Sequence, residues 1–212
     1  MVKSNNLVAE VSAACRERLT SEGFRPRTGD IFTRSVAGDV ISWLGLNRAV
    51  GPSGAPVEIN PVFGVRHQAL ESLVAELLGA KTHCYIPATL SISLGYLMPN
   101  SKYRSWMFSG DSPVAGVADD LVAAVREYGP PYVKRHDSLA AIVQSMESGE
   151  GVKEFAALRL PVGYFLLGQR SLAMGALESS ESAIGDRRDL AAQHFRAFAG
   201  NFRRTVDVSE GR

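Results

Sequence analysis

The stretch that decides the fold reads Val57-Glu58-Ile59-Asn60-Pro61-Val62-Phe63-Gly64-Val65-Arg66. Its positions 57, 59, 61, 63 and 65 are apolar and lie on one side of an extended chain, because successive side chains of a strand point to opposite faces. This alternation is typical of an antiparallel sheet with one packed face and one face in solvent. Pro61 has no backbone N–H to donate, which predicts an edge position or a bulge for this strand.

Further strands are predicted on both sides of this stretch. Alternating or β-rich runs separated by turn residues predict strands over residues 24–27, 31–36, 40–46, 90–98 and 103–108, with residues 47–56 as a loop. The last two of these strands are predicted to form a hairpin across residues 99–102. Apolar residues at helical spacing predict helices over residues 5–21 and 70–77, the second of which ends at Gly79.

From Asp111 onward the apolar spacing is helical. It predicts a helix that Gly129-Pro130-Pro131 ends, a helix over residues 138–148, a helix that Pro161 opens and that runs to about residue 179, and a last helix capped by Asp186. The predicted fold class is therefore α+β, a mostly antiparallel sheet of four to six strands packed by helices, with a helical C-terminal half. We expect a single domain over residues 1–212, with a sheet-rich half with two helices (1–110) and a helical half (111–212).

Composition limits the partners and the cellular compartment. The chain has 212 residues, and its 23 basic and 22 acidic side chains give a net charge of +1. That balance argues against nucleic acid or an anionic membrane as a partner. Neither an apolar signal core nor a stretch long enough to span a membrane is found, which predicts a cytoplasmic protein. Cys15 and Cys84 are too few for a disulfide framework, and both are expected to be reduced and to pack as small apolar side chains.

No motif for catalysis, metal binding or nucleotide binding is found in the sequence. The four histidines have no i+3 or i+4 partner of their kind, and neither H-E-x-x-H nor C-x-x-C spacing occurs. Phosphate-binding glycine motifs and the nucleophile elbow G-x-S-x-G are also missing. Asp119 and Asp120 are adjacent on a predicted helix, where neighbouring side chains diverge, so they are expected on a solvated surface. We therefore expect no cofactor, no metal and no catalytic residue.

Two alternatives to a binding function remain open. One is a hydrolase-like enzyme whose site is assembled from residues distant in the sequence, around Cys84, His83 or Asp111. The other is an adaptor that dimerises through the helix pair from Pro161 to Arg204, which predicts exposed apolar residues there, such as Phe198 or Phe202. The sequence leaves the oligomeric state undetermined.

One basic patch is a candidate binding surface. Arg25 and Arg27 share a face of the first predicted strand, and Arg34 lies on the second. Arginine and tryptophan are favoured anchors at protein interfaces, and a guanidinium group binds a carboxylate through two hydrogen bonds. The candidate partner-binding residues are Arg25, Arg27, Arg34, Trp43 and Arg66. The alternative is a solvated sheet face with scattered ion pairs, for example to Glu58.

Three segments carry a resemblance to a known family. They read Glu22-Gly23-Phe24-Arg25-Pro26-Arg27, Ile31-Phe32-Thr33-Arg34 and Glu58-Ile59-Asn60-Pro61-Val62-Phe63-Gly64-Val65. Over roughly residues 5–80 the chain resembles an uncharacterised bacterial domain family, some of whose members are encoded beside polymorphic toxins and are regarded as immunity proteins. The resemblance implies an α+β fold and no catalytic residues. Together with the patch, it leads us to expect a non-catalytic protein that binds another protein, such as a cognate toxin.

Overall fold

The computed structural model describes residues 3–49, 55–110 and 112–210, which form two compact units. Unit 1 combines the residues up to Val65 with Ser91–Arg135, and unit 2 combines Arg66–Leu90 with the residues from His136 onward. Each unit therefore contains two separate segments of the chain. The chain does not divide at Asp111, where the sequence changes from strand-like to helical spacing. The prediction of one domain stays a prediction.

The sheet has six strands among the described residues and is antiparallel. Its strands follow the order β1-β2-β3-β4-β5, and β6 also pairs with β4. The strands are β1 (Arg25–Pro26), β2 (Ile31–Ala37), β3 (Val40–Ala49), β4 (Val57–His67), β5 (Leu90–Ser93) and β6 (Trp106–Phe108). The predicted α+β class, with an antiparallel sheet and a helical C-terminal half, is confirmed. Residues 50–54 of the predicted loop lie outside the described residues.

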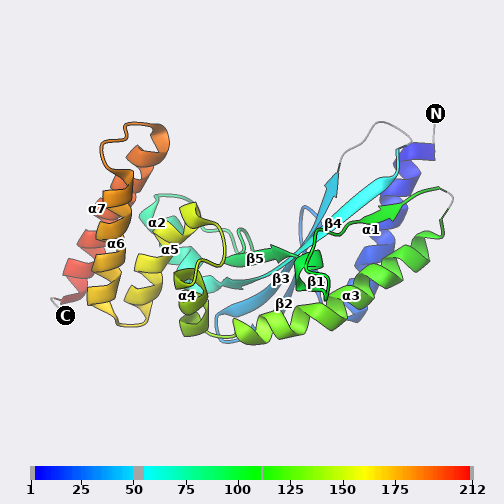
Figure 1. The fold of residues 1–212 in the computed structure, drawn as a ribbon, viewed down its shortest axis with the longest axis horizontal. Coiled ribbons are helices and arrows are strands. Elements are labelled where there is room, and N and C mark those ends of the chain that lie inside the picture. The colour runs from blue at the N-terminus through cyan, green and yellow to red at the C-terminus, as the bar shows by residue number, and fades with distance from the viewer. Residues whose placement is uncertain (1–2, 50–54, 111, 211–212) are drawn as a thin grey trace. The chain divides into compact units, whose positions relative to one another are not determined.

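The alternation along β4 is confirmed and places the core of unit 1. Val57, Ile59 and Phe63 are at most 4% exposed. The Phe63 ring makes edge contacts with the rings of Phe24 and Tyr132, at centroid distances of 6.4 and 6.5 Å. This packed face is covered by the helices α1 (Lys3–Ser21) and α3 (Val114–Arg135), which lie side by side (blue and light green in Figure 1).

Of the two predictions for Pro61, the edge strand is wrong, and the bulge stays a prediction. β4 lies inside the sheet, with β3 on one side and both β5 and β6 on the other. β6 pairs with the stretch from Val57 to Ile59, which ends two residues before Pro61. Pro61 thus lies near the point where the strand beside β4 changes from β6 to β5. A missing backbone N–H is tolerated there, because the hydrogen bonds between strands are already interrupted.

The predicted hairpin of residues 90–98 and 103–108 is also wrong. The strand β5 ends at Ser93, and a 3₁₀ helix, η1 (Leu94–Leu97), follows it. β5 and β6 each pair with β4 and not with one another. Because β4 has 11 residues, two short strands fit end to end along one of its edges.

The helix α3 passes through Gly129-Pro130-Pro131, where the sequence predicted its end. Tyr132 and Val133, beyond the prolines, are 2% and 7% exposed and belong to the buried side of the helix. Both prolines are exposed, so water can hydrate the carbonyl groups that their missing N–H groups leave without a partner. Burial of the last turns therefore outweighs the local penalty of the prolines.

Unit 2 is helical apart from its share of the sheet. It contains α2 (Gln68–Leu77), α4 (Leu139–Glu147), α5 (Lys153–Leu166), α6 (Arg170–Ile184) and α7 (Leu190–Glu210). His67 caps α2 by accepting a hydrogen bond from Leu70 N, and Ser138 caps α4 in the same way from Ala141 N. The predicted helices 70–77 and 138–148 are confirmed.

Two predictions for the end of the chain are wrong. Pro161 lies inside α5 and does not open a helix, and the break comes at Gly168, whose φ of +74° is readily adopted by glycine. The last helix is capped by Asp189, whose Oδ1 accepts from Ala192 N, and not by Asp186. Phe198 and Phe202 are fully buried and stack on one another, so neither is one of the exposed apolar residues that the adaptor alternative predicts.

Candidate functional site

The second face of the sheet in unit 1 brings three of the five candidate residues together. In the strand register Arg25 lies opposite Thr33, and Thr33 lies opposite Trp43, so all three side chains point to the same face. Arg27 is two residues from Arg25 and returns to that face, where its Nε donates a 3.0 Å hydrogen bond to Thr33 Oγ1. We call Arg25, Arg27, Thr33 and Trp43 the arginine–tryptophan face.

The side chains of this face differ in exposure. Arg25 and Arg27 are exposed, Trp43 is half-buried and Thr33 is 3% exposed. The Trp43 ring lies over Gly45, where a Cβ would come within 2.6 Å of the ring. Glycine at position 45 therefore allows the tryptophan to lie flat along its own strand. Among the described residues no acidic side chain pairs with Arg25.

Arg34 lies on the opposite face of the sheet. It is paired with Ser42, a residue of the packed face, and its guanidinium lies 4.7 Å from the centre of the Phe24 ring. Its Nη1 donates to the carbonyl oxygen of Glu22 at 3.2 Å. Arg34 therefore connects β2 to the end of α1 and does not join Arg25 and Arg27.

Arg66 is buried in unit 2, with 1% of its surface exposed. Its guanidinium donates to Gln68 Oε1 at 2.6 Å and to the carbonyl oxygens of Pro87 and His83 at 2.5 Å each. All three acceptors are groups of unit 2 itself, so the side chain offers no surface for a protein partner.

Two exposed residues near Glu58, on the second face of the sheet, were not predicted as candidate binding residues from the sequence. Met107 is 50% exposed and lies opposite Glu58, between the buried Trp106 and Phe108 of β6. Tyr103 is 56% exposed, and its hydroxyl donates to Glu58 Oε1 at 3.3 Å. The sequence shows the alternation around Met107, but it does not show that β6 pairs with β4. That pairing decides on which face of the sheet Met107 lies.

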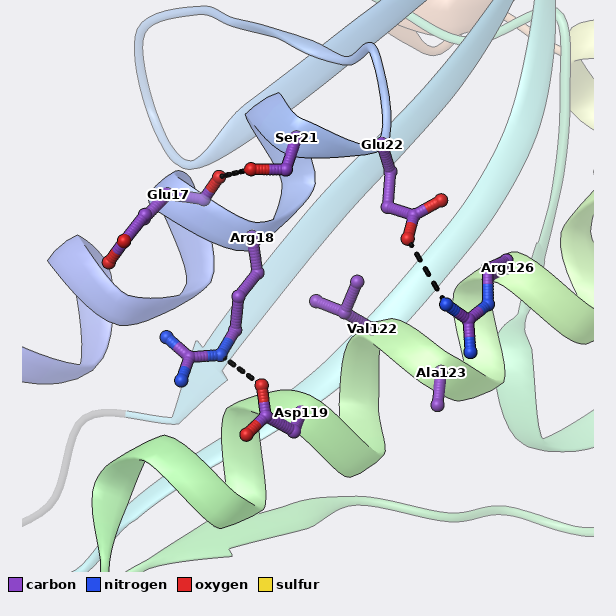
Figure 2. A pocket seen from close by; sticks show the side chains of 8 residues that line it. All are labelled: Glu17, Arg18, Ser21, Glu22, Asp119, Val122, Ala123 and Arg126. Atoms are coloured by element: carbon purple, nitrogen blue, oxygen red, sulfur yellow. Dashed lines mark hydrogen bonds and ion pairs between the residues drawn. The ribbon is translucent and has the colours of Figure 1, made fainter.

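A cleft between α1 and α3 has a volume of about 480 Å³ and is lined by charged and small side chains (Figure 2). Arg18 of α1 donates to Asp119 of α3, and Arg126 of α3 lies 3.5 Å from Glu22. The hydrogen bond from Arg18 lowers the pKa of Asp119 below its usual value. Arg18 pairs with Asp119 and Arg126 pairs with Glu22, so two ion pairs join α1 to α3 across this cleft.

The adjacent carboxylates Asp119 and Asp120 diverge, as expected, but both have partners. Asp120 Oδ2 accepts from Trp106 Nε1 at 2.7 Å and from Arg104 Nη2 at 2.8 Å. Asp119 instead faces Arg18 of α1. The two carboxylates therefore position α3 against two different neighbours.

The residues named for a hydrolase do not form a catalytic arrangement among the described side chains. Cys84 is exposed, contrary to the expectation that it packs in the core, and Nδ1 of His83 accepts from Tyr85 N. Asp111 lies outside the described residues.

A second histidine meets a serine and a carboxylate. His136 Nε2 lies 3.0 Å from Ser145 Oγ and 3.3 Å from Glu150 Oε2. A serine–histidine–acid relay uses the two different ring nitrogens, whereas here both contacts fall on the same nitrogen. His136 is fully buried, so this cluster holds α4 within unit 2. No group of three metal-ligating side chains is found in the part of the chain that the structure describes.

None of the described helices has the length and apolar content of a membrane span. No protein-family model matches this chain, and no match is found among curated proteins or solved structures.

Proposed function

We propose that this protein is a non-catalytic binding protein that recognises another protein through the arginine–tryptophan face. The observation that carries the proposal is the convergence of Arg25, Arg27 and Trp43 around Thr33, on the sheet face opposite α1 and α3. Two exposed guanidinium groups and one half-buried indole form a compact patch with the composition of an interface anchor.

The chemistry of the patch defines its partner. A guanidinium group binds a carboxylate through two parallel hydrogen bonds, and this geometry favours a partner surface with Asp or Glu side chains. The indole of Trp43 adds apolar contact area next to the charges. Met107 of β6, which is 50% exposed opposite Glu58, is a further exposed apolar side chain on the sheet face turned away from α1 and α3. The proposed partner is therefore a protein with an acidic surface patch.

An immunity-type role is the more specific form of this proposal, and the family resemblance supports it. In that role the partner is a toxin encoded in a neighbouring gene, and binding neutralises its activity. A basic face suits this role when the toxin presents carboxylates at or near its own active surface.

The test is binding of the purified full-length protein to the product of a neighbouring toxin-like gene, measured by titration calorimetry. The double variant Arg25→Glu/Arg27→Glu should weaken binding by about tenfold or more, because two attractive contacts become repulsive. The matched control is Arg16→Glu/Arg188→Glu, which makes the same change of charge at two exposed positions outside the face. Absence of binding by wild type, or equal weakening by both double variants, would reject the proposal.

A further inference from the structure

A cavity in unit 2, separate from the arginine–tryptophan face, combines buried charge with apolar walls. It has a volume of about 240 Å³ and lies between α2, α5 and the segment of residues 80–87. Arg66, Glu71 and Arg159 form its charged side, and Leu78, Ile86 and Phe155 are among its apolar residues.

The charged side of the cavity holds two cations and one anion. Arg66, Arg159 and Glu71 are 1%, 5% and 4% exposed. Arg159 Nε lies 2.8 Å from Glu71 Oε1, and Arg66 Nη1 lies 3.9 Å from Glu71 Oε2. The cluster therefore keeps one positive charge in excess, in surroundings where an uncompensated charge is costly.

The other contacts of the two arginines are neutral. Arg66 donates to one side-chain amide and two backbone carbonyls, and Arg159 donates to the carbonyls of Thr89 and Ala88. Carbonyl groups satisfy N–H donors but do not cancel charge. A guanidinium has five N–H donors, and the described residues accept three hydrogen bonds from Arg66, so two donors remain.

The electrostatic balance of Arg66 agrees with this excess of positive charge. Burial lowers the pKa of its guanidinium, Glu71 opposes that effect, and the nearby Arg159 reinforces it. Exposed Lys81 also lines the cavity and adds positive charge. The field inside the cavity therefore favours an anion.

We propose that this cavity binds a small organic monoanion, a carboxylate with a short apolar body. The carboxylate lies against Arg66 and Arg159 and neutralises the buried excess charge, and the apolar body lies against Leu78, Ile86 and Phe155. This site is independent of the proposed protein-binding face, since it uses other residues of another unit. The same pair of arginines also holds the segment from His83 to Thr89, so ligand binding and the conformation of that segment are linked.

The test uses the full-length protein and three probes of equal length, which are hexanoate, hexanamide and hexylamine. Titration calorimetry should show saturable binding of hexanoate, about tenfold or more tighter than hexanamide, and no binding of the cationic amine. Equal affinity for hexanoate and hexanamide would overturn the proposal, because the charge would then play no part. Absence of saturable hexanoate binding in the millimolar range would also overturn it.

Three variants locate the binding without changing the charged cluster. Ala75→Phe fills the cavity from α2, and Ala69→Phe makes the same change on the same helix outside the cavity. Ala75→Phe should abolish hexanoate binding, whereas Ala69→Phe should keep it. Ile86→Trp, at a residue that is 40% exposed, blocks the cavity from the segment of residues 80–87. It is used in place of Ala75→Phe if circular dichroism shows that Ala75→Phe is unfolded. Unchanged binding by a folded cavity-blocking variant would place the ligand elsewhere and overturn the proposal.

Discussion

Gly129 of α3 lies against the ring of Phe63 of β4, so closely that a Cβ at position 129 would come within 2.6 Å of Cζ of the ring. Phe63 is fully buried and also contacts Phe24 and Tyr132, so it has little freedom to move away. This glycine therefore allows helix and sheet to approach each other in unit 1, and it does not end the helix.

Substitution of this glycine should destabilise the protein. We expect Gly129→Ala to lower the free energy of unfolding by about 1–3 kcal/mol, because the added methyl group overpacks the core. The control is Gly116→Ala on the same helix, where a Cβ meets nothing within 4 Å. That change should be neutral or stabilise by up to about 1 kcal/mol. Urea denaturation measures both, and a larger loss for Gly116→Ala would contradict the packing described.

The buried anion Glu71 should be essential for stability. In Glu71→Gln the carboxylate that faces Arg159 and Arg66 is lost, and two buried cations remain without a counter-charge. We expect the free energy of unfolding to fall by about 3–5 kcal/mol. Glu76→Gln, at an exposed position of the same helix, should change it by about 0.5 kcal/mol or less. Similar effects of the two variants in thermal and urea unfolding would show that the cluster does not stabilise unit 2.

The two cysteines should react at very different rates. Cys84 is exposed and should be modified by a thiol reagent within the mixing time at mildly alkaline pH, whereas Cys15 is fully buried and should react only as fast as the protein opens. Mass spectrometry after brief labelling should show one modified thiol, absent from Cys84→Ser. Rapid labelling of Cys15 in the native protein would contradict its place in the core.

Alkaline pH should destabilise the protein through Cys15. Burial raises the pKa of this thiol to about 11 from the model-compound value of 9.0. The folded state thus holds the proton more tightly than the unfolded state. The contribution of the protonated Cys15 thiol to the free energy of unfolding is therefore complete below pH 9 and is lost as the pH rises towards 11. The loss should approach roughly 2–3 kcal/mol. Cys15→Ala should lack this part of the pH dependence, and identical pH profiles for the two proteins would refute the assignment.

The start of α7 should depend on Asp189 and not on Asp186. Asp189 Oδ1 accepts from Ala192 N, the usual contact of an N-cap, and its carboxylate also pairs with Arg187 at 2.9 Å. Asp189→Ala should cost about 1 kcal/mol of unfolding free energy. Asp186→Ala, three residues earlier at an exposed position, should cost far less. A larger loss of unfolding free energy for Asp186→Ala than for Asp189→Ala in denaturant titrations would show that Asp186 is the cap, as the sequence predicts.

The candidate site could be predicted only in part. Period-two alternation placed Arg25 and Arg27 on one face, because that relation depends on two residues of one strand. The same alternation does not show that Arg34 lies on the other face, because which residues of two strands share a face depends on the register between the strands. The sequence predicts Arg66 as a surface residue because its acceptors, the carbonyl groups of His83 and Pro87, are more than fifteen positions away.

The sequence by itself determined the α+β class, the buried side of β4 and most of the helices, because these follow from the spacing of apolar residues a few positions apart. Tertiary structure alone decided that α3 continues through two prolines, that β5 and β6 share one edge of β4, and that Arg66, Glu71 and Arg159 meet. In each case burial against residues distant in the chain outweighs a local preference or brings distant groups together, such as Glu71 and Arg159, which are 88 positions apart. Local periodicity carries no information about such contacts, because their free energy arises only once the chain has folded.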